Sequence, residues 1–265
     1  MAPKFTVRAF IAWIVLPLLV VIATGAWFEF GPGLRWGHQS ARILANMPQD
    51  EFERRVQTYL LEHPEVIIES VNRMEARQRA SAEAELETIV ESRADELFRD
   101  ANTPVGGNPN GDVTLVEFFD YNCPYCRQMA PVMIQAEGAD AQLRVVFKEF
   151  PILGPNSVFA AKAALAAHKQ GKYVAFHQAL MQVRSATDAS RVWEVANQTS
   201  LDVERLKADM DDPTIRAAID KNLALARALR IDGTPGFVIG DQILRGATDL
   251  QTLQGWIREA RGRRQ

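Results

Sequence analysis

Residues 115–133, LVEFFDYNCPYCRQMAPVM, carry the strongest indication of fold in this chain of 265 residues. They overlap the run VTLVEFF of residues 113–119, whose β-branched and apolar composition predicts a buried strand. The motif Cys123-Pro124-Tyr125-Cys126 follows, and a helical stretch is predicted through about residue 136. A cysteine pair that follows an apolar strand and opens a helix predicts an α/β domain with redox chemistry.

The sequence contains only two cysteines, so a disulfide within one chain can join only Cys123 and Cys126. A bridge across so short a segment removes little entropy from the unfolded chain, which makes it a poor structural staple and favours a redox role. The alternative is half of a zinc site. Zinc needs four ligands, or three and a water, and none of the four histidines lies in a second paired motif.

The position of Pro124 predicts where the helix begins. Proline suits the first helical turn, because its missing N–H has no partner to lose there. Cys123 then occupies the N-cap, where unpaired backbone N–H groups and the helix dipole stabilise negative charge. We expect this environment to favour the thiolate of Cys123 as nucleophile and leaving group. Cys126 is expected to be more buried and to attack the mixed disulfide, which releases the substrate.

An N-terminal run of 20 uncharged residues, AFIAWIVLPLLVVIATGAWF at 9–28, is long enough to cross a membrane as a helix. Lys4 and Arg8 precede it, which predicts that the N-terminus stays in the cytoplasm. The alternative is a cleaved signal peptide, because residues 23–25 loosely resemble a cleavage site. We therefore expect the rest of the chain at the periplasmic side of the bacterial inner membrane, anchored by residues 9–28, or soluble in the periplasm after cleavage.

Changes in composition divide the chain into four segments. We expect a signal anchor or signal peptide at 1–30, a linker at 31–48, a helical extension at 49–102 and a catalytic domain at 103–265.

Within the catalytic domain, the Ala-rich stretch of about residues 157–230 predicts a block of several helices. Further strands are predicted at 143–150, 237–239 and 243–245, the last two as a hairpin, and a final helix at 250–260. The turn-rich stretch 103–112 predicts a break before the first strand.

The helical extension is a candidate for self-association. Apolar residues recur at helical spacing between Phe52 and Met74, with an interruption at His63-Pro64, because the residue before a proline avoids the helical region. The charged stretch that follows has a thin apolar stripe, formed by Leu86, Ile89, Val90, Leu97 and Phe98. A helix charged almost all round is typical of a solvated connector, and the alternative is a seam for another copy of the chain. A homo-oligomer through residues 49–100 is compatible with both features, and residues 52–74 favour it most.

The overall composition is that of an ordinary globular protein, with 47% hydrophobic and 24% charged residues. The formal net charge is −3, so the chain has no excess of positive charge that would attract a nucleic acid, and we expect no nucleic-acid partner. We predict no metal and no separate cofactor, because the redox group is the Cys123–Cys126 pair itself.

Three motifs occur in the same order as in a known family. The segments LVEFFDYNCPYCRQMAPVM (115–133), VFKEFPILGPNS (146–157) and GTPGFVIG (233–240) resemble the DsbA-like branch of the thioredoxin superfamily. The leader YLLEHPEVIIESVNRMEARQ (59–78) is similar to the N-terminal extension of ScsC-like members, some of which oligomerise through it. The resemblance implies a thioredoxin-like α/β fold with an inserted helical domain, preceded here by a membrane helix and a helical extension.

The resemblance also implies roles for residues of the cysteine motif. Cys123 matches the exposed nucleophile and Cys126 the resolving cysteine. Pro124 and Tyr125 match the dipeptide that tunes the redox potential and faces the substrate. DsbA itself has Pro-His here, so one contribution to thiolate stabilisation is missing, and the strength of the oxidant is left open.

Three further positions match the family pattern. Thr234-Pro235 matches the loop with a cis-proline that faces the cysteines, beside which an extended substrate can pair. Glu117 matches an acidic residue beneath the active site that takes protons during exchange. From its position on a neighbouring strand, Lys148 is a candidate ion-pair partner of Glu117.

These features leave three functions open. The first is a thiol:disulfide oxidoreductase that forms disulfides in exported proteins, with cysteine-containing substrates and a membrane redox partner. The second is a disulfide isomerase or reductase that a membrane partner keeps reduced. The third is a copper-tolerance protein that uses the thiolates as soft ligands.

Overall fold

The computed structural model describes residues 47–263, in two compact units that divide between Arg77 and Gln78. The predicted membrane segment 9–28 and nearly all of the predicted linker lie outside the described residues. Within residues 47–263, no helix combines the length and the apolar character needed to cross a membrane.

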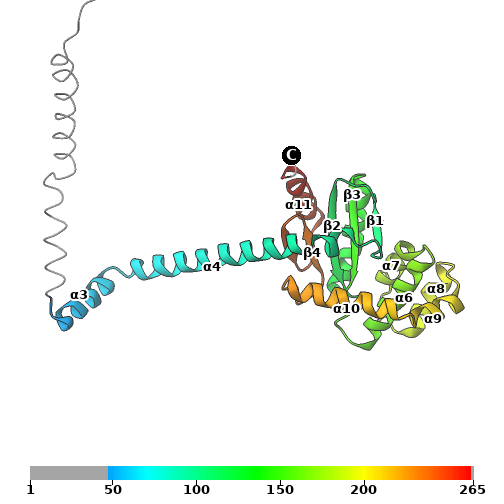
Figure 1. The fold of residues 1–265 in the computed structure, drawn as a ribbon, viewed down its shortest axis with the longest axis horizontal. Helices are drawn as coiled ribbons and strands as arrows, with labels where there is room; N and C mark the ends of the chain where they lie inside the picture. Colours follow the sequence, from blue (N-terminus) through cyan, green and yellow to red (C-terminus); the bar gives the residue numbers. More distant parts are fainter. Residues whose placement is uncertain (1–46, 264–265) are drawn as a thin grey trace, which may run out of the picture. The chain divides into compact units, whose positions relative to one another are not determined.

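The first unit contains helix α3 (Gln49–Glu62) and the start of helix α4 (Glu65–Ser92) (Figure 1). The interruption predicted at His63-Pro64 is confirmed, because α3 ends just before these residues and α4 begins just after them. All the apolar side chains predicted between Phe52 and Met74 are at least partly exposed, and none of the described residues of α3 is buried.

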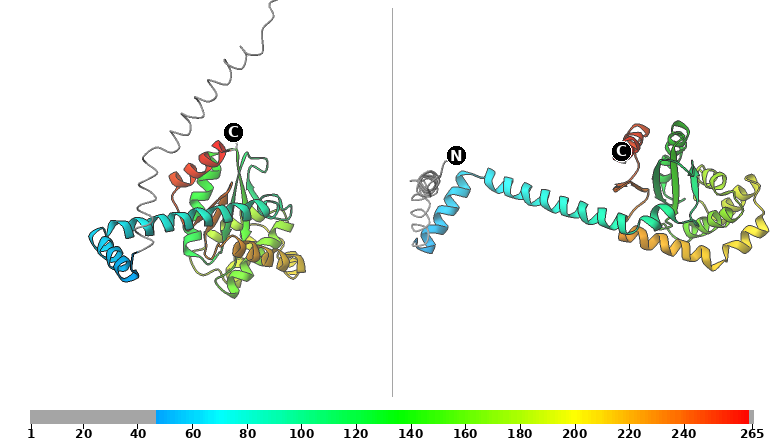
Figure 2. Two further views of the ribbon diagram at one scale, coloured as in Figure 1. Left: turned by 60° about the vertical axis from the view of Figure 1, so that its left-hand side comes forward. Right: turned by 45° about the horizontal axis from the view of Figure 1, so that its top comes forward.

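The second unit contains a five-stranded sheet in the order β1-β3-β2-β4-β5 (Figures 1 and 2). Its strands are β1 (Val105–Gly107), β2 (Val113–Phe119), β3 (Leu143–Glu149), β4 (Gly236–Ile239) and β5 (Gln242–Arg245). Strands β2 and β3 are parallel, and the other neighbours are antiparallel. The strands predicted near 113, 143, 237 and 243 are confirmed, whereas β1 lies in the stretch predicted as a turn-rich break. Its three residues include two glycines, which weaken the composition signal of a strand.

The helices of the second unit include α5 (Pro124–Ala139), which follows β2, and α11 (Leu250–Gly262) at the end of the chain. Between β3 and β4 lies the inserted block, with α6 (Pro155–Lys169), α7 (Tyr173–Met181), α8 (Ala189–Gln198), α9 (Val203–Met210) and α10 (Pro213–Ala228). Four aspartates cap helices of this unit by accepting hydrogen bonds from backbone N–H groups: Asp188, Asp202, Asp212 and Asp249.

Two apolar clusters fill the two faces of the sheet. Alternate residues of β2 divide between them, with Leu115 and Phe119 in the cluster that contains α5 and α11, and Val116 and Phe118 in the other. The second cluster also contains Val90 and Leu97, which are 3% and 0% exposed. The prediction that this part of the apolar stripe is a solvated connector or a seam for another copy is therefore wrong. These side chains pack on the chain's own sheet, a long-range contact that helical spacing does not specify.

Between α4 and β1 the chain forms a short π-helix, η1 (Asp95–Arg99). Cationic side chains from β3 bind the carbonyl oxygens of this segment: Nζ of Lys148 donates to the oxygen of Glu96 (2.7 Å), and Nη1 of Arg144 donates to that of Phe98 (2.8 Å). These bonds give partners to carbonyl oxygens that would otherwise lack one, because the last carbonyl groups of a helix have no donor within the helix.

Candidate active site

Cys123 lies at the N-cap of α5, with φ −79° and ψ 119°, and Pro124 occupies the first helical turn. This is the local arrangement expected from the sequence. The Sγ atom of Cys123 donates a hydrogen bond of 3.2 Å to the carbonyl oxygen of Thr234. Cys123 is 4% exposed and Cys126 is fully buried, and both are free thiols. The expected nucleophile is therefore less exposed than the family pattern implies, because the loop at Thr234 lies against its sulfur.

The Thr234–Pro235 peptide bond is cis. Pro235 is buried, Thr234 is partly buried, and β4 begins at the next residue, Gly236. Strand β4 pairs with β2 in the register Phe118↔Gly236, which brings this loop to the end of β2, where the cysteine motif begins. The structure thus brings together the two segments of the site that are most distant in sequence.

A narrow cavity of about 10 Å³ lies behind the cysteines, and Glu117, Cys126 and Glu137 line it. Glu117 is 2% exposed, on the strand that leads to the cysteine motif. Burial raises the pKa of Glu117 to about 8, and the neighbouring Glu137 carboxylate adds to the rise. Burial also raises the pKa of the Cys126 thiol far above its ordinary value, and the charge of Glu117 acts in the same direction.

Lys148 does not pair with Glu117. In the parallel register of β2 and β3, Glu117 lies beside Phe147, and Phe118 lies beside Lys148. Because side chains alternate between the two faces of a sheet, Lys148 points to the face opposite the cysteines. Its Nζ atom donates to the carbonyl oxygen of Glu96 and to Oγ1 of Thr103, and burial lowers its pKa to about 8.

Asp120, 1% exposed, joins the cysteine loop to the loop after β3. Its Oδ1 atom accepts from the backbone N–H of Asn122 (2.8 Å), and its Oδ2 atom accepts from the N–H groups of Ile152 and Leu153 (2.9 Å each). Its own carbonyl oxygen accepts from the N–H of Cys123 (3.0 Å). One buried residue therefore ties the Cys123 loop to the loop of Ile152 and Leu153.

A second set of hydrogen bonds joins the cysteine loop to the inserted helices. Oδ1 of Asn122 accepts from the N–H of Thr187 (2.8 Å), and Nδ2 of Asn122 donates to Oγ of Ser157 (3.2 Å). Arg127 donates from Nη2 to Oγ1 of Thr187 (3.2 Å) and from Nε to the carbonyl oxygen of Tyr121 (2.9 Å). The insertion thus helps to hold the cysteine loop in place.

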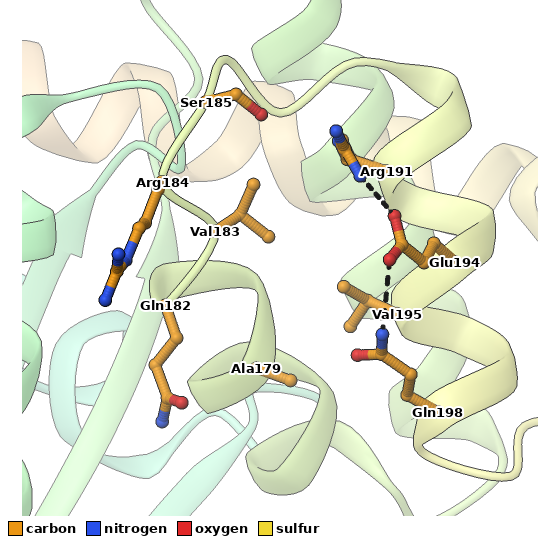
Figure 3. Close-up of a pocket in the computed structure, with 9 residues that line it drawn as sticks. All are labelled: Ala179, Gln182, Val183, Arg184, Ser185, Arg191, Glu194, Val195 and Gln198. Carbon is orange, nitrogen blue, oxygen red and sulfur yellow. Dashed lines mark hydrogen bonds and ion pairs between the residues drawn. The ribbon is translucent and has the colours of Figure 1, made fainter.

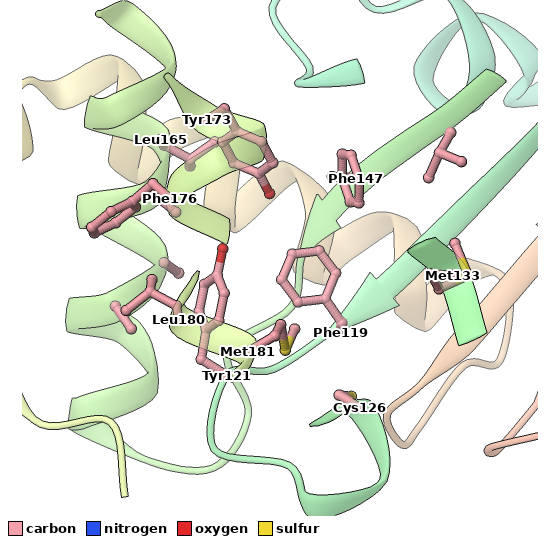
Figure 4. Close-up of a cluster of buried hydrophobic side chains, with 14 of the residues drawn as sticks. Phe119, Tyr121, Cys126, Met133, Phe147, Leu165, Tyr173, Phe176, Leu180 and Met181 are labelled. Carbon is pink, nitrogen blue, oxygen red and sulfur yellow. The ribbon is translucent and has the colours of Figure 1, made fainter. Parts of the chain in front are cut away.

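A buried polar network lies between the sheet and α7. The hydroxyl groups of Tyr121 and Tyr173 donate to Oε1 of Glu149, at 3.0 and 2.7 Å, and the Tyr121 hydroxyl lies 3.1 Å from Nδ1 of His177. Figure 4 shows both tyrosines among the apolar side chains that surround them. Burial raises the pKa of Glu149 well above its usual value and lowers that of His177 to about 3.

Exposed apolar side chains occur on the loops of the site. Tyr125 of the cysteine motif is 61% exposed, and Ile152 and Leu153, held by Asp120, are 38% and 51% exposed. Exposed apolar side chains therefore lie on both of the segments that Asp120 joins.

A separate cavity of about 420 Å³ lies between α7 and α8, where Arg191 pairs with Glu194 (Figure 3). None of the residues predicted for the active site lines it. Within residues 47–263, no three His, Cys, Asp or Glu side chains are placed to hold a metal ion together.

Sequence reasoning missed Asp120, Asn122, Glu137, His177 and the Tyr121–Glu149 pair. Asp120 and Asn122 flank the cysteines within the quoted motif, so their position was a usable signal. Glu149 likewise lies within the quoted segment 146–157, whereas His177 gave no such signal, because its partner Tyr121 lies 56 residues away in the sequence.

Residues 114–258, more than half of the chain, match the family of DSBA-like thioredoxin domains. The chain belongs to this family. Residues 49–81 match the N-terminal domain of the copper resistance protein ScsC. This DsbA-like chain has a thioredoxin-like α/β fold with a helical insertion, and the DsbA-like and ScsC-like proteins that it resembles are thiol–disulfide oxidoreductases. Enzymes of this kind exchange disulfides with substrate proteins and use a cysteine pair without a separate cofactor.

Several solved structures are similar to this DsbA-like chain. A thioredoxin-like oxidoreductase from Silicibacter pomeroyi is 48% identical, over 63% of this chain and 97% of that one, with a TM-score of 0.62. A linker-deletion variant of Proteus mirabilis ScsC is 28% identical, over 82% and 98%, with a TM-score of 0.63. A periplasmic thioredoxin-like protein from Salmonella enterica serovar Typhimurium is 30% identical, over 64% and 95%, with a TM-score of 0.56.

Curated relatives include longer proteins. The Na(+)/H(+) antiporter NhaA of Herminiimonas arsenicoxydans is 30% identical over 159 residues, which are 59% of this chain and 25% of that protein. The DsbA-like chain therefore spans about a quarter of the first relatives that it matches. Disulfide bond formation protein D of Bacillus subtilis is 25% identical over 173 residues, which are 60% of this chain and 78% of that protein.

Proposed function

We propose that this protein forms disulfides in exported proteins, with Cys123 as the nucleophile and Cys126 as the resolving cysteine. The observation that carries the proposal is the position of the Cys123 sulfur at the N-terminus of α5, against the carbonyl oxygen of Thr234. Backbone N–H groups at a helix N-terminus stabilise a thiolate, which makes Cys123 the better leaving group of the pair. Burial disfavours the thiolate of Cys126, so this sulfur stays inside while Cys123 exchanges.

The reaction is two successive thiol–disulfide exchanges. A substrate thiolate attacks Sγ of Cys123, the bond between the two sulfurs breaks, and Cys126 leaves and takes up a proton. A second substrate thiolate then attacks the substrate sulfur of the mixed disulfide and expels the thiolate of Cys123. The substrate is oxidised by two electrons, the protein holds two thiols, and a membrane redox partner accepts the electrons when it reforms the Cys123–Cys126 disulfide.

Glu117 is the proposed proton donor and acceptor for Cys126, because both line one cavity and a carboxyl with a pKa of about 8 exchanges protons near neutral pH. Thr234 and Pro235 are proposed to bind the substrate backbone as an added strand. Pro124 is proposed to tune the redox potential with Tyr125, and the exposed ring of Tyr125 to contact substrate side chains.

The trapped redox state in intact cells tests the direction of the reaction. Rapid acid quenching followed by alkylation preserves the thiols, and a shift in gel mobility reports them. An oxidase is found mainly with the Cys123–Cys126 disulfide. Recovery mainly as free thiols contradicts the proposal and supports an isomerase or reductase that a membrane partner keeps reduced.

The match of residues 49–81 to the ScsC N-terminal domain favours the isomerase or reductase as second candidate. On α4, Ile67, Val71 and Met74 lie on one helical face and are 49%, 42% and 46% exposed. An apolar helical face that is exposed to water is stabilised when it packs against a partner. An oligomer formed in this way would bring several active sites together, which suits the rearrangement of disulfides in a substrate. A homo-oligomer through the helical extension, built on residues 52–74, is therefore part of this candidate.

Light scattering on the full-length protein in detergent measures the oligomeric state. The double variant Ile67→Glu, Val71→Glu is expected to lower the particle mass to that of one chain. The control Ala76→Glu, Ala80→Glu places the same charges on the opposite helical face. Equal masses for both variants and the wild type count against this interface.

The name of the ScsC N-terminal domain includes copper resistance, which keeps a copper-tolerance protein as a third candidate. Thiolates are soft ligands that suit Cu(I). Titration with Cu(I) under reducing conditions tests this candidate. Tight binding of one ion that is lost in Cys123→Ser supports it, and equal weak binding by both proteins counts against it.

A periplasmic location, with residues 9–28 as anchor or cleaved signal peptide, fits the uncharged N-terminal run and the relative called periplasmic. The proposed organisation is a signal segment at 1–30, a linker at 31–48, a helical extension at 49–102 and the DsbA-like domain at 103–265. Mass spectrometry of the purified native protein distinguishes an intact N-terminus from a cleaved one.

A further inference from the structure

Glu117 is enclosed, so protons that it exchanges with Cys126 need a route to water. The titratable side chains that line the cavity behind the cysteines are Glu117 from β2, Cys126 and Glu137 from α5, and His177 from α7. A cavity of about 10 Å³ has room for about one water molecule. Glu117, Cys126 and His177 are buried, and Glu137 is partly exposed.

Glu137 spans the distance between the cavity and the edge of the sheet. A Cβ atom at Gly106, on the edge strand β1, would lie 3.3 Å from Oε2 of Glu137 and 2.8 Å from Cε2 of Phe147. The missing side chain at Gly106 therefore leaves space for this carboxyl group. Burial raises the pKa of Glu137, and the backbone N–H of Gly107 opposes the rise.

The other elements packed around Glu117 offer no alternative outlet among the described residues. Its partners in the sheet register are Phe147 on β3 and Phe237 on β4, both apolar. Lys148 lies on the opposite face of the sheet. His177 is 6% exposed, its Nδ1 atom already faces the Tyr121 hydroxyl, and its pKa is lowered to about 3.

We propose that Glu137 is the proton outlet of the active site, which passes protons between bulk water and the Glu117–Cys126 pair. The inference rests on the proposed roles of Glu117 and Cys126. When a substrate thiolate breaks the Cys123–Cys126 bond, the Cys126 thiolate takes a proton from the Glu117 carboxyl group through one water. Glu117 is then a carboxylate, and Glu137 supplies it with a proton drawn from bulk water. The steps reverse when Cys126 must lose its proton.

The two carboxyl groups also act on each other. Two carboxylates that share a site resist a second negative charge, so one of them holds a proton over a wider pH range. Removal of the Glu137 charge should therefore make Glu117 easier to ionise. This electrostatic effect can be measured without any turnover.

The variants Glu137→Gln and Glu137→Asp on the full-length protein test the proposal. Glu204→Gln is the matched control, because it removes one exposed carboxylate outside the cavity. The first readout is the titration of the Glu117 carboxyl carbon by ¹³C NMR, with the signal assigned through Glu117→Gln. The second is the rate of disulfide transfer to a dithiol peptide between pH 5.5 and 9, divided at each pH by the rate of the control.

In Glu137→Gln, the midpoint of Glu117 is expected to fall by about half a pH unit or more, because a like charge is gone. The transfer rate is expected to drop about threefold to tenfold, a fraction of the effect of a direct general acid. Glu137→Asp keeps the charge and should retain most of both properties. A Glu117 midpoint and a transfer rate equal to those of Glu204→Gln overturn the proposal. If the proposed function itself is wrong, the result is different: the wild-type protein then shows no disulfide transfer to the peptide.

Discussion

The thiol of Cys123 donates a hydrogen bond of 3.2 Å to the backbone carbonyl oxygen of Thr234, a residue 111 positions further along the chain. The contact places the loop of the cis peptide bond directly against the sulfur. In the proposed reaction, a substrate that attacks Cys123 approaches beside Thr234, where backbone groups can pair with an extended chain. Cys126 has no such access, since it is fully buried behind Cys123.

Cys126→Ser is expected to accumulate a mixed disulfide between Cys123 and a disulfide-containing substrate such as insulin. The resolving thiol is absent, so the intermediate is not released. Non-reducing gels and mass spectrometry detect the adduct. Cys123→Ser serves as the control and should form none, because the remaining sulfur is buried. An adduct of equal yield in Cys123→Ser would reverse the assigned roles.

Glu117→Gln is expected to change the pH dependence of stability. The pKa of Glu117 is about 8 in the folded protein and about 4.5 in the unfolded chain. Between these values the folded state holds a proton that the unfolded state has released, so the free energy of unfolding falls as pH rises, by at most about 1.4 kcal/mol per unit. Glutamine does not titrate, so the variant gains stability relative to the wild type from pH 5 to pH 8.

Urea unfolding at pH 5, 6.5 and 8 measures this difference, with Glu204→Gln as the control for an exposed carboxylate. A stability difference that stays constant over this range would mean that Glu117 has an ordinary pKa in the folded protein.

Asp120→Asn is expected to lower kcat/KM for disulfide transfer about tenfold to a hundredfold, because small displacements of a reacting group are costly. Asparagine keeps one acceptor oxygen but presents an NH₂ group to N–H donors that Asp120 now satisfies. We also expect a loss of about 1–3 kcal/mol in unfolding free energy. Asp249→Asn, at a helix cap, is the matched control and should change stability only. Unaltered transfer kinetics in Asp120→Asn would show that its hydrogen bonds do not position Cys123.

Lys148→Met is expected to leave the pH profile of disulfide transfer unchanged and to lower the free energy of unfolding by about 1–3 kcal/mol. The amine satisfies the carbonyl oxygen of Glu96 and the hydroxyl of Thr103, on the sheet face opposite Glu117. Thermal unfolding and transfer rates are measured on the same samples. A displaced pH profile would point to a coupling between Lys148 and Glu117 that the register does not provide.

Short-range sequence patterns were sufficient to predict the redox motif and most of the helices and strands around it. An apolar run predicts β2, Pro124 marks the start of α5, and the spacing of the cysteines puts both sulfurs near the first helical turn. The hairpin of β4 and β5 and the break at His63-Pro64 follow from the same short-range rules. These features depend on neighbours within a few residues, so the order of amino acids specifies them directly.

The partners of Glu117 needed the folded chain. The β2–β3 register turns Lys148 away and the packing of α5 brings Glu137 close, and neither the register nor the packing is a local property. The same holds for Val90 and Leu97, which looked like a connector and belong to the core, and for β1, which pairing with β3 maintains despite its glycines. Each of these features rests on contacts between segments far apart in the chain, and burial in three dimensions, not residue type, sets their chemistry.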